Sequence, residues 1–194
     1  MINNSPMNVG LFFGSFNPIH NGHLAIAAYL YNHYALDEIW FVLSPQNPLK
    51  NEKNILSKEQ RLRMLEAALL PFDNFKASTV EFDMPTPSYT YLTLRKLREI
   101  HPTFSFSVIM GNDAMASIEL WKNYREIIDN YTIYLYPRNN IRLSIDKENI
   151  IITKAPVLPI SSTDIRENIS EGKTITELVP EAVNQIIIAE KLYR

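Results

Sequence analysis

The chain has 194 residues, of which 46% are hydrophobic and 21% charged, close to the composition of an ordinary globular protein. This length fits one domain spanning 1–194 with a substantial buried core. The formal net charge of −2 disfavours a nucleic-acid partner, which needs a strongly basic surface, and the absence of cysteine excludes disulfides and thiolate catalysis.

The apolar runs stay well below the roughly 20 residues that cross a bilayer. Residues 1–8 lack the basic start and apolar core of a signal peptide. We therefore expect a cytoplasmic protein with no membrane partner. The sequence leaves open whether copies of the chain form a homo-oligomer.

Short apolar segments alternate with helical patterns, beginning with a buried strand over 9–13. A helix over about 22–34 follows a glycine-containing turn, and 38–43 is the next strand. Ser57 and Gln60 have the spacing of a capping box, which predicts a helix that ends before Pro71.

The same alternation continues to the end of the chain. Further strands are expected at 75–80, 104–110, 131–136 and 150–153, and further helices at 91–100, 163–170 and 180–193, the last with Pro180 in its first turn. A loop is expected after Gly111, and 43–53 should form a surface loop. This order predicts an α/β fold around a parallel sheet, with ligands at the carboxyl ends of its strands.

Two histidines lie three positions apart at a predicted helix start, His20 and His23, with Gly22 before the second. Side chains at this spacing share a helical face, and N–H groups at a helix start attract phosphate, so the pair is placed to hold a polyphosphate. Alternatively, the glycines only make a turn and the histidines are exposed or capping residues. Two histidines alone are an incomplete zinc site, and the segment matches neither the dinucleotide fingerprint nor the phosphate-binding loop.

The string His20-Asn21-Gly22-His23 resembles the His-x-Gly-His signature of a superfamily of nucleotidyltransferases. The resemblance implies a Rossmann-like, doubly wound parallel sheet that binds ATP or CTP. It also implies that the two histidines hold the nucleotide phosphates and stabilise the transition state of attack on the α-phosphate.

A cluster of hydroxyl residues opens the predicted helix near the C-terminus, with Arg166 about one turn inside it. An ordinary helix cap would explain the serines, and Arg166 would then face solvent. Hydroxyls, helix-start N–H groups and a bidentate cation are equally suited to hold departing pyrophosphate. The string from Ile160 to Arg166 resembles the Ile-Ser-Ser-Thr-x-x-Arg motif of the same superfamily, and it begins a small helical portion over 160–194.

The two motifs together define an implied ATP site. The resemblance assigns catalysis to His20, His23 and Arg166, and ATP binding to these three and to Gly14, Ser15, Phe16, Gly111, Asp113, Ile160, Ser161 and Ser162. Magnesium would be held mainly by the ATP phosphates, with no metal site on the protein, because Mg²⁺ keeps few protein ligands.

Within the superfamily the chain most resembles bacterial nicotinate-nucleotide adenylyltransferases, over nearly its whole length. The matching strings are Pro87-Ser88-Tyr89-Thr90, Gly111-Asn112-Asp113-Ala114, Trp121-Lys122 and Pro137-Arg138. The resemblance implies that Thr90, Trp121 and Lys122 hold the nicotinate ring and carboxylate, and that Lys50 and Arg138 contact the acceptor phosphate. Packing in the core is an equal alternative for Trp121, as is a solvated surface position for either cation.

The chain departs from the family pattern at two positions. Leu49 stands where a histidine is usual before Lys50, and Asn17 stands where aspartate is common in the first motif. The histidine contact is therefore not transferred, and Asn17 is expected only to form hydrogen bonds.

The implied reaction joins nicotinate mononucleotide to the adenylyl group of ATP, giving deamido-NAD and pyrophosphate in NAD biosynthesis. Pantetheine-phosphate and nicotinamide mononucleotide adenylyltransferases are the alternatives, and a cytidylyltransferase is a weaker one. His20 and Trp121 argue against the pantetheine enzyme, which usually has threonine at the first histidine. A different class would be a nucleotide-binding sensor without catalysis.

Overall fold

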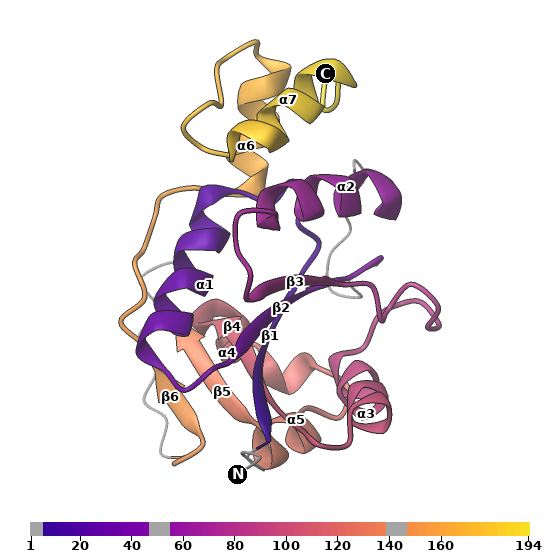
Figure 1. The fold of residues 1–194 in the computed structure, drawn as a ribbon, viewed down its shortest axis with the longest axis vertical. Coiled ribbons are helices and arrows are strands. Elements are labelled where there is room, and N and C mark those ends of the chain that lie inside the picture. Colours follow the sequence, from indigo (N-terminus) through magenta and orange to yellow (C-terminus); the bar gives the residue numbers. More distant parts are fainter. Residues whose placement is uncertain (1–5, 47–54, 139–146) are drawn as a thin grey trace.

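The computed structural model describes residues 6–46, 55–138 and 147–194. Its centre is a sheet of six parallel strands in the order β3-β2-β1-β4-β5-β6 (Figure 1). The strands are β1 (Met7–Gly14), β2 (Glu38–Leu43), β3 (Phe75–Ser78), β4 (Phe104–Gly111), β5 (Thr132–Tyr136) and β6 (Ile150–Ile152). The predicted α/β fold with a Rossmann-like parallel sheet is confirmed.

The strand order reverses between β1 and β4. The chain runs outward from β1 through β2 to β3, then returns to the other side of β1 and continues through β5 to β6. The loops that leave β1 and β4 therefore diverge to opposite faces, which opens a crevice at the carboxyl ends of these two strands. This crevice is where a ligand is expected to bind.

Helices cover both faces of the sheet (Figure 1). They are α1 (Asn21–His33), α2 (Lys58–Leu69), α3 (Thr90–Ile100), α4 (Asn112–Ala116), the 3-10 helix η1 (Ile118–Leu120), α5 (Tyr124–Asn130), α6 (Ser162–Ser170) and α7 (Glu181–Ala189). Successive strand side chains point to opposite faces. Phe12 accordingly packs in a core cluster with residues of α1 and α2, whereas Leu11 packs in a second cluster with residues of α3 and α5.

The capping box predicted before α2 is present. Ser57 Oγ accepts a hydrogen bond from the Gln60 amide at 3.2 Å, and Gln60 Oε1 accepts one from the Ser57 amide at 3.3 Å. The helix predicted over 180–193 is shorter than expected. It runs from Glu181 to Ala189, and Pro180 is its N-cap rather than a residue of its first turn. The last residues turn instead, with φ of 53° at Lys191 and 64° at Tyr193.

The connection from β4 to β5 also differs from the prediction, which placed a loop after Gly111. It contains α4, η1 and α5 instead, and β3 ends at Ser78 rather than at residue 80. In α5 only Ile127 is fully buried, so this seven-residue helix is too short to show an apolar period. The surface loop expected over 43–53 falls largely outside the described residues.

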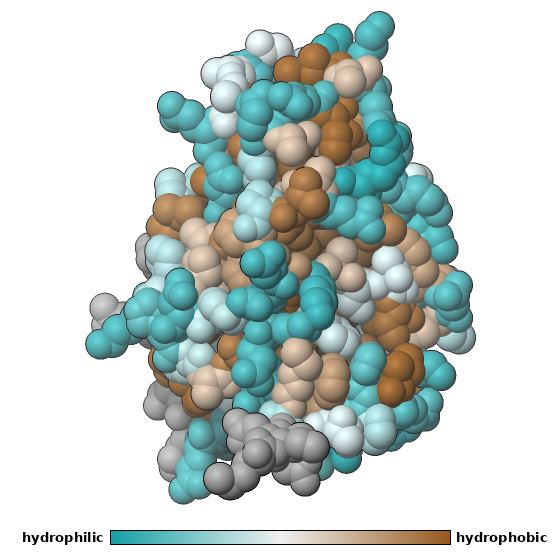
Figure 2. All heavy atoms as spheres, in the orientation of Figure 1, coloured by the Kyte–Doolittle hydropathy of each residue, from teal (hydrophilic) through white to brown (hydrophobic). Residues whose placement is uncertain are grey.

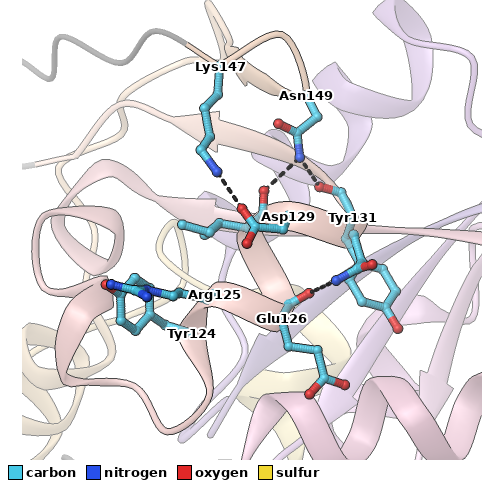
Figure 3. A network of polar contacts seen from close by, with 9 residues as sticks. Tyr124, Arg125, Glu126, Asp129, Tyr131, Lys147 and Asn149 are labelled. Atoms are coloured by element: carbon cyan, nitrogen blue, oxygen red, sulfur yellow. Dashed lines mark hydrogen bonds and ion pairs between the residues drawn. The ribbon is translucent and has the colours of Figure 1, made fainter.

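The edge strand β6 is fastened by polar contacts that precede it (Figure 3). The Asn149 side-chain amide donates to the carbonyls of Ile128 and Tyr131 at 2.8 and 2.9 Å. Lys147 pairs with Asp129 beside it. These contacts fix the start of β6 to the turn between α5 and β5.

Hydrophilic and apolar residues are mixed over the face of the molecule shown in Figure 2. The most exposed large apolar side chains, Leu70 and Leu120, lie after α2 and at the end of η1 rather than together. None of the described helices combines the length and the apolar composition needed to cross a membrane.

Arg61 of α2 is almost completely buried, at 1% exposure. Its guanidinium donates hydrogen bonds to the carbonyls of Ser15 (2.8 Å), Ser44 (2.8 Å), Pro45 (3.1 Å) and Leu56 (3.0 Å). Ser15 directly follows β1, and Ser44 directly follows β2. One side chain therefore fixes the two loops that leave the carboxyl edge of the sheet.

Replacing Arg61 with methionine should lower the free energy of unfolding by about 3 kcal/mol or more, because one buried and three partly buried carbonyls lose their donor. Urea denaturation of the two proteins measures this difference. Arg63→Met is the matched control: Arg63 lies on the same helix, is 62% exposed and forms a surface ion pair with Glu190. That control should change stability by about 1 kcal/mol at most. Equal losses in the two variants would contradict the role of Arg61.

Candidate active site

A cavity of about 610 Å³ lies at the carboxyl edge of the sheet. Its wall includes Gly14 at the end of β1, Ser44 after β2, Gly111 at the end of β4 and Tyr136 at the end of β5. The carboxyl ends of four neighbouring strands thus border one space, three through their last residue and β2 through the residue that follows it. This is the crevice that the reversal of strand order predicts.

The cavity brings together many of the residues selected from the sequence. Those that line it are Gly14, Ser15, Thr90, Gly111, Asp113, Trp121, Lys122 and Arg138. Those outside its lining are Phe16, His20, His23, Ile160, Ser161, Ser162 and Arg166. Lys50 and Leu49 fall outside the described residues. The two nucleotide motifs therefore lie outside the cavity lining, whereas four other residues expected to bind ATP line the cavity together with the described acceptor residues.

The two histidines of the first motif are stacked. His20 is the N-cap of α1, and its ring centroid lies 3.7 Å from that of His23 in the first turn, with 29° between the ring planes. A Cβ atom at position 22 would come within 3.0 Å of the His20 ring. Gly22 is thus the residue that allows the pair to stack, which explains the glycine of the motif in steric terms.

Two phenylalanine side chains pack against the histidine pair through His23. The His23 ring lies 5.8 Å from Phe12 and 5.2 Å from Phe16, both edge to face. Phe16 has a positive φ of 43° and is buried, and a Cβ at Gly14 would come within 2.9 Å of its ring. Phe16 therefore acts in the packing beneath the histidines rather than at the cavity wall.

His20 is held uncharged by its surroundings. Burial lowers its pKa from 6.5 to about 4, the positive charge of Arg138 acts in the same direction, and Asp164 acts weakly against both. The imidazole is only 6% exposed. At neutral pH it is therefore a neutral hydrogen-bonding group, without a fixed positive charge.

The second motif is joined directly to the first. Ser162 Oγ donates to the Pro18 carbonyl at 2.9 Å, and Arg166 Nη1 donates to the Asn17 carbonyl at 2.8 Å. Ser161 is the N-cap of α6, with its Oγ accepting from the Asp164 amide at 3.1 Å. The capping alternative is therefore confirmed for Ser161. Arg166 does not simply face solvent, since it binds the loop that carries the histidines.

Asn17 links this loop to the end of the chain. It is 1% exposed, and its Oδ1 accepts hydrogen bonds from the Tyr193 hydroxyl at 2.8 Å and the Leu56 amide at 3.4 Å. The expectation that Asn17 forms hydrogen bonds is confirmed. Tyr193 was not selected from the sequence, because its partner is 176 positions away and nothing local indicates the contact.

The β4 and β5 ends meet through Asp113 and Arg138. Arg138 Nη1 lies 3.5 Å from Asp113 Oδ2, and its backbone amide donates to Asn112 Oδ1 at 2.8 Å. Asp113 Oδ1 also approaches Gly111 so closely that a Cβ there would lie 2.3 Å from it. Arg138 is half-exposed, yet it lines the cavity and is paired, so it is not an isolated surface charge.

The predicted acceptor residues gather at the start of α3 and after η1. Thr90 is the first residue of α3, whose N-cap Tyr89 makes no side-chain cap. Lys122 Nζ lies 4.8 Å from the Tyr89 ring centroid. Trp121 packs against the second core cluster and also lines the cavity, so packing and a position at the site hold together for this side chain.

Similarity to known proteins shows which class of enzyme this chain belongs to. A family model described as cytidylyltransferase-like matches residues 11–168, a range that contains both motifs. The fold and this match define a nucleotidyltransferase of the cytidylyltransferase-like class. Relatives named nicotinate-nucleotide adenylyltransferase are 42% identical in Flavobacterium johnsoniae and 43% identical in Flavobacterium psychrophilum, each across 97% of this chain and 100% of the relative. The chain belongs to the nicotinate-nucleotide adenylyltransferase family.

Solved structures agree on the fold. Nicotinic acid mononucleotide adenylyltransferase of Plasmodium falciparum, solved in complexes with NaAD and with APC, superposes with TM-scores of 0.80 and 0.79. Each is 20% identical and matches across 96% of this chain and 97% of the other. At that identity the likeness concerns the fold.

The lowered pKa of His20 has a consequence for stability. The unfolded chain binds a proton at His20 below about pH 6.5, whereas the folded chain does so only near pH 4. The histidine therefore makes stability rise with pH, by about 2 kcal/mol from about pH 4.5 to about pH 6.5. In His20→Gln this share of the pH dependence should disappear, as measured by denaturation at each pH.

The exposed His33, at the opposite end of α1, supplies the control. His33→Gln shows what the loss of an exposed imidazole from the same helix does to stability. If His20→Gln kept the wild-type dependence on pH, burial would not be holding His20 uncharged.

Proposed function

We propose that this chain transfers the adenylyl group of ATP to nicotinate mononucleotide, giving deamido-NAD and pyrophosphate. The observation that carries the proposal is the contact between the two motifs, in which Arg166 and Ser162 bind the loop leading to His20. That contact brings the two nucleotide motifs together beside a cavity lined by Thr90, Trp121, Lys122 and Arg138, the described residues assigned to the acceptor. The identity of 42% and 43% to relatives named nicotinate-nucleotide adenylyltransferase, over 97% of this chain, supports the choice of acceptor.

At the ATP end, His20 and His23 would hold oxygens of the triphosphate. The acceptor phosphate oxygen attacks the α-phosphorus in line, the bond from that phosphorus to the bridging oxygen breaks, and pyrophosphate leaves. Negative charge builds on the α-phosphate oxygens in the transition state. Imidazole N–H groups fixed by stacking stabilise this charge without reorganising, so they act as electrostatic groups and no covalent intermediate is required.

Arg166 and the first turn of α6 would receive the leaving pyrophosphate. The helix start offers amide donors, and Arg166 adds a positive charge one turn further along. Because Arg166 also binds the Asn17 carbonyl, it holds the helix start beside the histidines. We thus propose that 160–194 completes the site and that 1–194 functions as one nucleotidyltransferase domain.

Magnesium would enter with the ATP phosphates. Across the described ranges, no group of three or more His, Asp and Glu side chains is arranged to hold a metal ion. Mg²⁺ is suited to binding through phosphates and water with few protein ligands. We propose that the chain works in the cytoplasm; assembly into a homo-oligomer stays an open prediction.

At the acceptor end, Thr90 at the start of α3 and Lys122 nearby would bind the nicotinate carboxylate, with Trp121 against the pyridine ring. The first amides of α3 are suited to an anion, since Tyr89 provides no side-chain cap. Arg138 and Lys50 would contact the acceptor phosphate. The cations Lys122 and Arg138 in the cavity wall favour an acceptor with a carboxylate over one with a neutral amide in its place.

An acceptor panel tests the proposal. With ATP and magnesium, the protein should release pyrophosphate with nicotinate mononucleotide at least about tenfold faster than with nicotinamide mononucleotide or phosphopantetheine. The physical reason is the charge of the carboxylate, because one lost charge-assisted contact costs about 1.5 kcal/mol or more. A coupled pyrophosphate assay gives the rates.

His23→Ala provides the background rate for this panel, because it removes one of the stacked imidazoles. It should remain folded and lose nearly all turnover with every acceptor. Equal rates of the wild-type protein with the acid and the amide would reject the acceptor assignment. A protein that binds ATP and turns over no acceptor would be the non-catalytic sensor.

Replacing Trp121 with phenylalanine separates its two roles. If Trp121 stacks on the acceptor, the KM for nicotinate mononucleotide should rise about threefold or more, while the KM for ATP stays unchanged. Trp40→Phe is the control, since Trp40 is buried in the same core cluster and does not line the cavity. An unchanged acceptor KM in Trp121→Phe would leave packing as its only role.

A further inference from the structure

Glu81 is a buried acid at the cavity that the sequence did not single out. It is 2% exposed and forms part of the wall together with Ser44 and Ser88. Its Oε1 accepts a hydrogen bond from Thr93 Oγ1 at 2.7 Å, and Thr93 is itself fully buried in α3. Within the described part of the chain, Oε2 is buried and has no hydrogen-bond partner.

The surroundings of Glu81 oppose its ionisation. Burial raises the pKa of its carboxyl, and the hydroxyls of Thr93, Ser88 and Ser44 lower it by less. Lys122, Arg138 and Asp113 share the cavity wall, and Lys58 of α2 donates to the neighbouring Phe82 carbonyl at 3.3 Å. Burial still outweighs the favourable contacts, so the uncharged acid is favoured over a wider range of pH than for an exposed glutamate.

Glu81 shares the cavity wall with three segments that are hydrogen-bonded to one another. The Ser88 amide donates to the Gln46 carbonyl at 3.0 Å, which joins the approach to α3 to the segment after β2. The Ser44 amide donates to the Gly14 carbonyl at 2.9 Å, which joins that segment to the end of β1. Thr90 lies two positions beyond Ser88, and Glu81 is bonded to Thr93 in the first turn of the same helix, so Glu81 contacts the part of α3 that is assigned to the acceptor.

We propose that Glu81 is a positioning residue for the acceptor: bonded to Thr93 of α3 and lining the wall beside Ser44 and Ser88, it supports the start of α3, and a negative charge on it weakens acceptor binding. Ionisation would place a negative charge in the wall of a cavity whose acceptor is itself an anion, and like charges in such proximity oppose binding. The acceptor's charge belongs to the proposed function, on which this inference rests. The ATP phosphates are assigned to the histidines, which lie outside the lining of this cavity, so ATP binding should be affected less than acceptor binding.

The pair Glu81→Gln and Glu81→Ala tests the inference. Glutamine has the shape of the uncharged acid and does not titrate, so the two acceptor KM values should agree at the acidic end of a pH series. As the pH is raised, the wild-type KM should rise about tenfold or more relative to Glu81→Gln. Glu81→Ala should raise the acceptor KM at every pH, because Thr93 loses its partner. At each pH, the KM for ATP should differ less than about twofold between either variant and the wild type.

Asp83→Asn is the matched control, because Asp83 is an exposed acid in the same segment. Its pH profile should follow the wild type. Thermal melting reports folding, and if Glu81→Ala does not fold, the pH profile of Glu81→Gln decides alone. Parallel profiles of the wild type and Glu81→Gln, or equal rises of the ATP and acceptor KM values, would overturn the inference.

The experiment separates this inference from the proposed function. Every acceptor in the panel carries a phosphate and is therefore an anion. The profiles are measured with the acceptor that the wild-type protein uses best. Preference for another acceptor would reject nicotinate mononucleotide, whereas the divergence between wild type and Glu81→Gln would still support or reject the role of Glu81.

Discussion

The buried guanidinium of Arg61 is the contact on which the geometry of the site depends. A parallel sheet delivers its loops to one edge, but it does not by itself fix their paths, because loops lack the ladder hydrogen bonds of strands. Arg61 reaches from α2 and donates to carbonyls directly after β1 and β2. Its five N–H donors in one rigid plane suit this task better than a lysine would. The phosphate loop and the acceptor side of the cavity are therefore positioned by one side chain that touches neither predicted substrate group.

A second set of contacts fixes the loop that leads to the two histidines. The loop containing Asn17 is held from the C-terminal part of the chain, by Arg166 at its carbonyl and by Tyr193 at its side chain. Each contact spans about three quarters or more of the sequence, so the site cannot form until α6 and the residues after α7 have packed against α1 and α2. This explains why the small helical portion contributes to the site even though it adds no strand to the sheet.

How far the sequence predicts this protein depends on whether a contact is local. The apolar strands, the Ser57 capping box and the spacing of His20 and His23 are local patterns, and the structure contains them. Glu81, Arg61 and Tyr193 are single polar residues whose partners lie elsewhere in the chain, so no pattern marked them. The short α5 was missed for a related reason, since one buried residue makes no period. The resemblance selected residues that meet at the cavity, and their roles in binding stay predictions.

Around the cavity, the charge of a side chain follows its exposure to solvent. Both proposed substrates are anions, and each additional fixed negative charge in the wall would weaken their binding. Two buried titratable groups, Glu81 in the wall and His20 outside the cavity lining, are held toward their uncharged forms by their burial. The cations Arg138 and Lys122 lie at more exposed positions, where their charge costs little desolvation and still acts across the cavity. Neutral buried groups can fix hydrogen-bond geometry while partly solvated cations attract the substrates. This explains why a proton on Glu81 matters for the acceptor. With the proton, the carboxyl in that wall is uncharged; without it, the negative charge of the carboxylate repels the anionic acceptor.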